Sequence, residues 1–123
     1  MSLKARRIIF WIMQTILLIV FLGEGSTKLL GLQFQIEAFM RWGYPTWLRF
    51  VIGTLEIAGA IGLLTKLRTW TTLGLFGIML GAIYTHLTHH EAPVIAFPIF
   101  MIILLILSTR LKKKMDSPVT PAK

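Results

Sequence analysis

Long apolar stretches alternate with short polar segments along most of the chain. The apolar stretches are Ile8–Leu22, Leu48–Leu64, Trp70–Leu87 and Ala92–Ser108. A helix needs about 20 apolar residues to cross the roughly 30 Å hydrocarbon core of a bilayer. Each stretch approaches this length, so the pattern predicts four membrane-crossing helices. Four crossings use most of the 123 residues, which leaves no room for a soluble catalytic domain.

The segment between the first two stretches has a different, amphipathic pattern. Leu32, Ile36 and Phe39 recur at helical spacing, whereas Glu37 and Arg41 are polar and lie one turn apart. This pattern predicts a short interfacial helix that lies on the membrane. We therefore expect an all-α fold, a polytopic transmembrane four-helix bundle with a short interfacial helix between the first two crossings. Short connections favour up-and-down neighbours.

Prolines mark the start of the fourth crossing and the end of the chain. Pro93 suits a first helical turn, whereas Pro98 lies deeper, where we expect it to kink the helix. We assign residues 1–114 to a single four-helix transmembrane domain. Residues 115–123, which contain two further prolines, are expected to form a flexible cytoplasmic tail.

Most of the basic residues behind the net charge of +8 gather in three places. Basic residues precede the first stretch, separate the second from the third, and follow the fourth: Lys4, Arg6, Arg7; Lys66, Arg68; Arg110, Lys112, Lys113, Lys114. The segment after the third stretch, residues 89–91, contains no Lys or Arg. The positive-inside rule then places both termini on the cytoplasmic side of a bacterial-type inner membrane. The charge is thus a topology signal, and we do not expect nucleic-acid binding.

The basic N-terminus followed by an apolar run also resembles a secretory signal peptide. Residues 23–26, however, do not form a small-x-small cleavage site, and three more apolar stretches follow. We therefore interpret the first stretch as a retained helix.

Glu56 lies in the middle of the second apolar stretch. A carboxylate at this depth costs several kcal/mol unless it is protonated or paired. Glu24 and Lys28 lie one turn apart if the first helix continues past its apolar stretch. Glu24 and His86 lie nearer the outer surface than Glu56. We expect all four side chains to meet in a polar pocket in the outer half of the bundle, as candidates for ligand binding or proton relay.

Two interpretations of Glu56 remain open at this point. It forms a structural ion pair with Lys28 that fixes the first helix against the second, or it is a protonatable group that contacts a ligand. Gln14, in the first helix, is better explained by a hydrogen bond between helices than by ligand binding. Gly53 and Gly59 in the second helix, and the Gly77-x-x-x-Gly81 motif in the third, predict close packing between helices.

Few other residues of the chain could carry redox, metal or catalytic chemistry. It has no cysteine, which excludes disulfide exchange and iron–sulfur clusters. His86, His89 and His90 invite a metal or haem interpretation, but we expect the helix to end before His90, which breaks their common face. Interfacial histidines without a metal are the favoured interpretation. We identify no catalytic residue and no redox centre, so whether the chain is an enzyme stays open.

Several motifs together resemble the DoxX-like family of small four-helix membrane proteins. They are Gly25-Ser-Thr-Lys28-Leu-Leu, Gly43-Tyr-Pro45, the segment Ile52–Leu64 with Glu56, a basic turn, and Met79–His86. The resemblance covers nearly the whole transmembrane region. It maps the Lys and Glu that the family typically keeps onto Lys28 and Glu56, whereas Glu24 is not expected across the family.

The resemblance implies a link to quinone-coupled sulfur and thiol oxidation, in which such proteins are membrane subunits beside soluble redox partners. The first hypothesis is therefore a non-catalytic, quinone-associated subunit whose His86, Glu56 or Lys28 hydrogen-bonds a quinone headgroup. The second is an accessory or assembly subunit of a larger membrane complex. The third and least favoured is a small proton-coupled transporter, because a permanently paired Glu56 cannot exchange protons.

The expected partners follow from these hypotheses. They are the lipid bilayer and other membrane or redox proteins, and a homo-oligomer is left open. Quinone is the candidate cofactor, although a lipid or sterol pocket would give the same sequence pattern.

Overall fold

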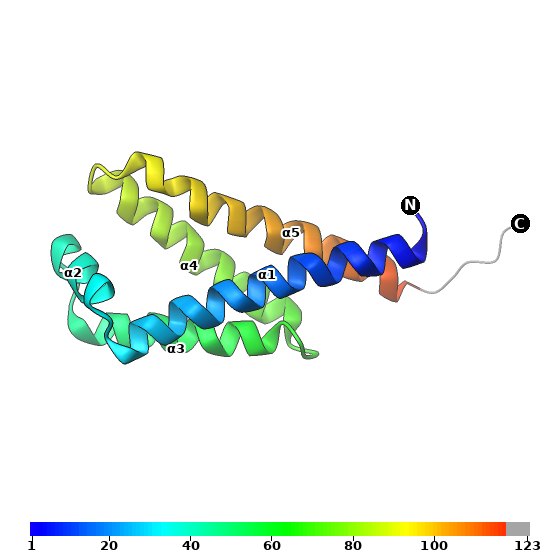
Figure 1. Cartoon of the computed structure of the whole chain (residues 1–123), viewed down its shortest axis with the longest axis horizontal. Helices are drawn as coiled ribbons and strands as arrows, with labels where there is room; N and C mark the ends of the chain where they lie inside the picture. The colour runs from blue at the N-terminus through cyan, green and yellow to red at the C-terminus, as the bar shows by residue number, and fades with distance from the viewer. Residues whose placement is uncertain (118–123) are drawn as a thin grey trace, which may run out of the picture.

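The computed structural model describes residues 1–117, which form five α-helices and one 3₁₀ turn (Figure 1). The elements are α1 (Leu3–Leu30), α2 (Gln33–Trp42), α3 (Thr46–Gly62), α4 (Arg68–Thr88), η1 (Ala92–Ile95) and α5 (Ala96–Asp116). Residues 118–123, where most of the predicted tail lies, are outside this range. The predicted all-α fold is confirmed.

The four long helices form a bundle with two different ends (Figure 1). Helix α1 packs against α3 and α5, and α4 packs against the same two helices. The α2 end consists of α2 and the turn between α4 and η1. The terminal end consists of the start of α1, the turn between α3 and α4, and the end of α5. The start of the first helix and the end of the last thus lie at the same end as the α3–α4 turn, as an up-and-down topology requires.

The helices have the length and surface of membrane-spanning segments. Three segments, α1, α4 and Ala92–Asp116, are long and apolar enough to cross a bilayer. Helix α3 has 17 residues and is about 25 Å long, so its crossing still depends on the sequence prediction. Large apolar side chains such as Ile19 (67% exposed) and Trp70 (73%) face outward. An apolar exterior suits lipid, and the chain is a membrane protein.

Helix α1 extends well beyond its apolar stretch at both ends. The Ser2 side chain accepts a hydrogen bond from the backbone N–H of Ala5 at 3.1 Å and caps the first turn. Gly31 ends the helix in a left-handed conformation (φ 68°) that favours glycine. The helix therefore runs through residues 23–26 without a break and presents Glu24 and Lys28 on successive turns.

The start of the last helix differs from the prediction. Pro93 lies in η1, whereas the α-helix begins only at Ala96. Pro98 therefore falls in the first turn of α5, where a backbone N–H would have no acceptor within the α-helix. The expected kink inside the helix is wrong, because the change from 3₁₀ to α geometry occurs before Pro98.

Glycines allow α1 and α3 to approach each other closely. A Cβ atom on Gly25 would lie 2.6 Å from Ile57 Cγ1 and 2.7 Å from the carbonyl oxygen of Gly53. Gly59 is similarly close to a leucine of α4. The predicted packing is confirmed for Gly53 and Gly59. It is wrong for Gly77 and Gly81, because no atom of another element lies within 4 Å of a Cβ added at either.

An apolar layer crosses the middle of the bundle. Its fully buried members come from α1, α4 and α5: Leu17, Phe21, Leu75, Met101 and Leu105. Polar side chains are buried on either side of this layer, towards the α2 end and towards the terminal end. The fold therefore separates two polar regions by packed hydrocarbon.

Candidate functional site

A cavity of about 700 Å³ lies at the α2 end. Its polar lining comes from four helices and the α2–α3 turn: Glu24, Lys28, Gln35, Glu37, Arg41, Trp42, Tyr44, Glu56, Tyr84, Thr85 and His86. Its apolar lining includes Phe34, Phe39, Leu48, Ile52, Met79 and Phe97. The cavity thus brings together all four residues that the sequence singles out.

Lys28 lies between two carboxylates. Its Nζ donates a hydrogen bond to Glu24 Oε2 at 3.1 Å, one turn earlier on α1. The same atom is 2.9 Å from Oε1 of Glu56 on α3. The Lys28 and Glu56 side chains are 10% and 2% exposed, whereas Glu24 is 37% exposed. One ammonium group therefore links α1 to α3 and is matched by opposite charge on both sides.

The Glu56 carboxylate has an unused hydrogen-bonding position. Its Oε1 is 2.9 Å from Lys28 Nζ, and among residues 1–117 no other group donates a hydrogen bond to the carboxylate. A carboxylate can accept several hydrogen bonds, so a single ammonium group does not use its full capacity. A ligand with a hydroxyl or N–H group can donate a further hydrogen bond to it.

Two residues that support Lys28 and Glu24 were not identified from the sequence. Gln35 Nε2 donates to Glu24 Oε2 at 3.3 Å and to Thr27 Oγ1 at 3.0 Å. The buried Arg49 donates through Nη1 to the backbone carbonyl of Lys28. Arg49 is a cation near the start of an apolar helix. This unusual position is the feature from which its buried role could have been predicted.

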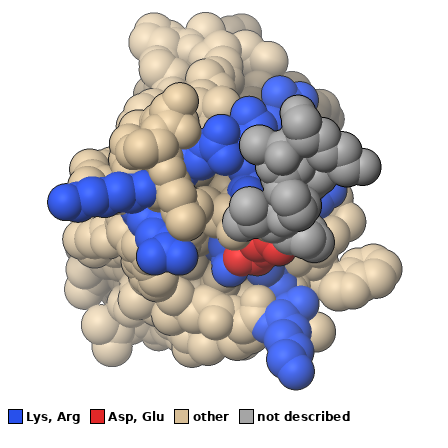
Figure 2. Space-filling model, turned by 90° about the vertical axis from the view of Figure 1, so that its right-hand side faces the viewer, with Lys and Arg blue, Asp and Glu red and all other residues tan. Residues whose placement is uncertain are grey.

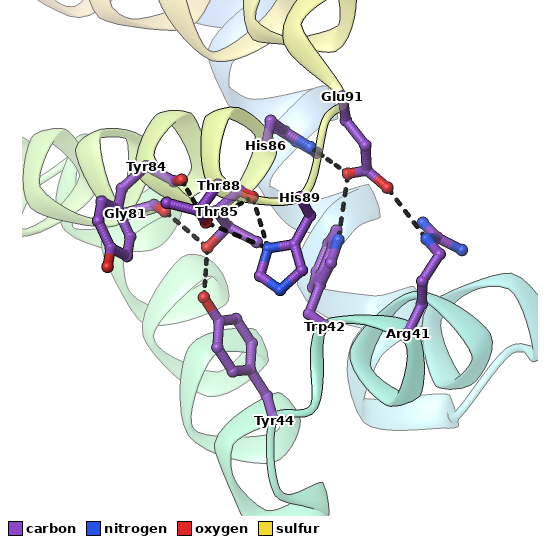
Figure 3. Close-up of polar contacts among 10 residues, drawn as sticks. All are labelled: Arg41, Trp42, Tyr44, Gly81, Tyr84, Thr85, His86, Thr88, His89 and Glu91. Atoms are coloured by element: carbon purple, nitrogen blue, oxygen red, sulfur yellow. Dashed lines mark hydrogen bonds and ion pairs between the residues drawn. The ribbon is translucent and has the colours of Figure 1, made fainter.

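His86 belongs to a second group of contacts, which holds α2 against the α4–η1 turn (Figure 3). His86 Nδ1 is 2.8 Å from Glu91 Oε1, to which Trp42 Nε1 also donates at 3.1 Å. Arg41 Nε donates to Glu91 Oε2 at 3.0 Å. Glu91 therefore contacts three polar side chains, two from α2 and one from α4.

Arg41 does not pair with Glu37, although the two lie one turn apart on α2. Glu37 accepts a hydrogen bond from Gln33 instead, at 3.1 Å, while Arg41 pairs with Glu91. The reason is tertiary: α2 lies so that Arg41 faces the α4–η1 turn, and spacing within one helix cannot reveal this.

The pKa of Glu91 is lowered from 4.5 to about 2. The largest cause is the hydrogen bond with His86, followed by those from Trp42 and Arg41. Glu91 is therefore a carboxylate at neutral pH and can only accept hydrogen bonds. His86 accordingly carries a hydrogen on Nδ1.

Tyr44 adds a further connection between the α2–α3 turn and α4 (Figure 3). Its hydroxyl is 2.7 Å from Thr85 Oγ1, which itself donates to the carbonyl of Gly81 at 2.8 Å. Tyr44 is therefore the donor to Thr85. Together with the Glu91 contacts, this bond keeps α2 over the cavity.

The other histidines do not complete a metal site within the described chain. His89 Nδ1 is 2.8 Å from the carbonyl of Thr85. Helix α4 ends at Thr88, as predicted, so His90 lies outside it. No group of three or more His, Asp or Glu side chains in residues 1–117 is arranged to hold a metal ion.

Comparisons with known proteins concern the family to which the chain belongs. The chain is 33% identical over 103 residues to the uncharacterized protein YdgD of Bacillus subtilis (strain 168), which covers 77% of this chain and 89% of that protein. No solved structure matches the chain. The model of the DoxX-like family matches residues 12–108, a range that holds Lys28, Glu56 and the cavity around them. With most of its length matched in this way, the chain belongs to the DoxX-like family.

Proposed function

We propose that this protein is a non-catalytic membrane subunit of a redox-linked system and that its cavity binds a quinone-type molecule. One observation carries the proposal: the cavity combines apolar walls with a buried lysine and a buried carboxylate that has no partner among residues 1–117 besides this lysine. Ligand cavities of this kind use a few polar groups to orient a mostly apolar molecule. A quinone has the same character, a small polar headgroup on a hydrocarbon chain.

The polar residues suit both oxidation states of such a headgroup. An oxidised quinone has two carbonyl acceptors, and the Lys28 ammonium can donate to one of them. A reduced quinol has hydroxyl donors, and the Glu56 carboxylate and Nε2 of His86 can accept them. We assign electron transfer to a partner protein, so the residues of this chain bind and orient the headgroup. The link of DoxX-like proteins to quinone-coupled oxidation supports this assignment.

The proposal includes an orientation in the membrane. We infer an inner-membrane protein with both termini and the α3–α4 turn in the cytoplasm. Its support is that the Lys and Arg side chains gather at the terminal end (Figure 2), which is the expected cytoplasmic side. The cavity then opens in the outer half of the bilayer.

The test is native mass spectrometry of the protein extracted gently from its own membrane, with identification of each bound small molecule. We expect a quinone bound to the wild type and lost from Glu56→Gln and His86→Ala. Asp116→Asn is the control, because it makes the same change from acid to amide far from the cavity. A sterol or phospholipid that depends on Glu56 in place of a quinone would overturn the quinone assignment.

A second candidate is an accessory or assembly subunit, and one observation favours it. Gly74, Gly77 and Gly81 leave one face of α4 open, with no atom within 4 Å of a Cβ added at any of them. Small residues in membrane helices allow another helix to approach closely. A partner protein, or a second copy of this chain, would pack there.

Variants separate this candidate from the first. Gly74→Leu combined with Gly77→Leu should abolish co-purification of a partner complex without changing ligand retention, because neither glycine lines the cavity. Gly23→Leu is the control, since Gly23 is also open but lies on α1. Equal co-purification by all variants would contradict docking on this face.

A further inference from the structure

A second cavity, of about 950 Å³, lies at the terminal end. It is formed by the start of α1, the α3–α4 turn and the end of α5. Its charged lining consists of four cations and one carboxylate: Lys66, Arg68, Lys112, Lys113 and Asp116. Figure 2 views this end and shows Lys and Arg side chains over much of it.

Arg68 is the most deeply placed of these cations. It is the first residue of α4 and is only 7% exposed. Its Nη1 donates to Gln14 Oε1 at 2.8 Å and to the carbonyl of Leu63 at 3.0 Å, and its Nη2 donates to Ser108 Oγ at 2.8 Å. Every one of these acceptors is neutral. The buried Nε has no acceptor among residues 1–117.

No carboxylate in the described chain lies within ion-pair distance of Arg68. Asp116, which lines the same cavity, is engaged by Lys112, with Oδ2 2.9 Å from Nζ. The lining therefore keeps a net charge of +3. A buried cation whose partners are all neutral has lost water without gaining a counter-charge, which is unfavourable until an anion arrives.

We propose that this cavity binds a phosphate group, carried by an anionic phospholipid of the surrounding leaflet. A guanidinium group suits phosphate because its planar array of N–H donors matches two phosphate oxygens, while lysines contribute point charges. Phe10 and Trp11 provide an apolar wall on the same cavity, next to which the glycerol and acyl chains of a lipid can lie. Free phosphate has the same chemistry as the lipid headgroup, but it has no apolar part that could contact Phe10 and Trp11.

The experiment uses the full chain in detergent, with phosphatidylglycerol, phosphatidylcholine or inorganic phosphate added and bound species counted by native mass spectrometry. We expect one phosphatidylglycerol per chain and little phosphatidylcholine. Lys66→Gln/Lys113→Gln should weaken phosphatidylglycerol binding by roughly tenfold or more, the size of one lost charge-assisted hydrogen bond. Arg68→Gln should weaken it further.

The control is Arg110→Gln/Lys114→Gln, which removes the same charge from exposed positions of α5 outside the cavity lining. This variant should bind like the wild type. It also keeps the test decisive if Arg68→Gln does not fold, because the two double variants leave Arg68 in place. If both double variants lost phosphatidylglycerol binding equally, the binding would depend on general surface charge. This result would overturn the proposed site. Saturation by inorganic phosphate with no preference for phosphatidylglycerol would overturn the lipid assignment.

Discussion

Each of the two cavities has one buried cation in its lining, Lys28 or Arg68, and the surroundings of these two cations differ. At the α2 end, Lys28 lies within 3.1 Å of both Glu24 and Glu56. At the terminal end, Arg68 donates only to neutral acceptors, the side chains of Gln14 and Ser108 and a backbone carbonyl. The charge of Lys28 is thus balanced by carboxylates of the same chain, whereas the charge of Arg68 has only neutral hydrogen-bond partners.

This difference indicates what each cavity can accept. A cavity whose buried cation is already matched by carboxylates suits an uncharged molecule with hydrogen-bonding groups. A region whose cation lacks a counter-charge attracts an anion. Because the apolar layer of Leu17, Phe21 and their neighbours separates the two, each region can be changed by mutation without direct contact with the other.

The largest effect is expected from Lys28→Met. The substitution leaves Glu56 buried without a cation and Glu24 without its partner. Breaking a buried ion pair by removing one member costs about 3–5 kcal/mol. The free energy of unfolding, measured by denaturant titration in detergent at pH 7, should fall by this amount.

A double variant makes this prediction specific. Lys28→Met/Glu56→Leu should recover much of the loss, because no uncompensated carboxylate then remains deeply buried. Lys66→Met, at an exposed position, should be close to wild type. If Lys28→Met were as stable as wild type, the ion pair would not hold α1 against α3.

Arg68→Met should cost less than Lys28→Met. It leaves Gln14 Oε1 and Ser108 Oγ without a donor, but it leaves no charge behind. Lost hydrogen bonds to a charged group are worth about 1.5–3 kcal/mol. The same titration in lipid-free detergent measures it, and a cost larger than that of Lys28→Met would reverse the comparison between the two regions.

The sequence was sufficient for the parts of this structure that follow from periodicity along a single helix. The apolar stretches predicted the helices, and the spacing of Leu32, Ile36 and Phe39 predicted α2. The spacing of Glu24 and Lys28 placed them on one stripe of α1. The interhelical bond expected for Gln14 is confirmed, since its Nε2 donates to the carbonyl of Leu63 at 3.1 Å.

What the sequence did not reveal depends on how helices are rotated against each other. Arg41 has Glu37 one turn away, yet pairs with Glu91, which is 50 positions distant along the chain. Gly77 and Gly81 have the spacing of a packing motif, yet their face of α4 is open in this chain. Arg68 was interpreted as a topology signal, because a charge at a helix end reveals nothing about its burial.

Gly25→Ala tests whether close packing of α1 on α3 maintains the ion pair. The new methyl group would meet Ile57 and the backbone of Gly53 at less than 3 Å, and the backbone cannot give way as a side chain can. Overpacking of this kind costs about 1–3 kcal/mol. Gly23→Ala is the matched control on the same helix, with no atom within 4 Å. It should be neutral or slightly stabilising because alanine favours helix. Equal melting temperatures for the two variants would contradict the proposed packing.

The smallest effect is expected from Glu91→Gln, and it should depend on pH. The folded pKa of Glu91, about 2, lies below the ordinary 4.5, so ionised Glu91 stabilises the fold above pH 4.5. This contribution should decline as the pH falls from 4.5 towards 2. Arg41 is exposed, so the ion-pair part is worth below about 1 kcal/mol. The melting temperature of wild type should exceed that of Glu91→Gln at pH 7, and the gap should narrow at pH 3. Glu37→Gln, on the exposed face of α2, should show no comparable gap. A gap that stayed constant down to pH 3 would mean that the Glu91 charge does not hold α2 over the cavity.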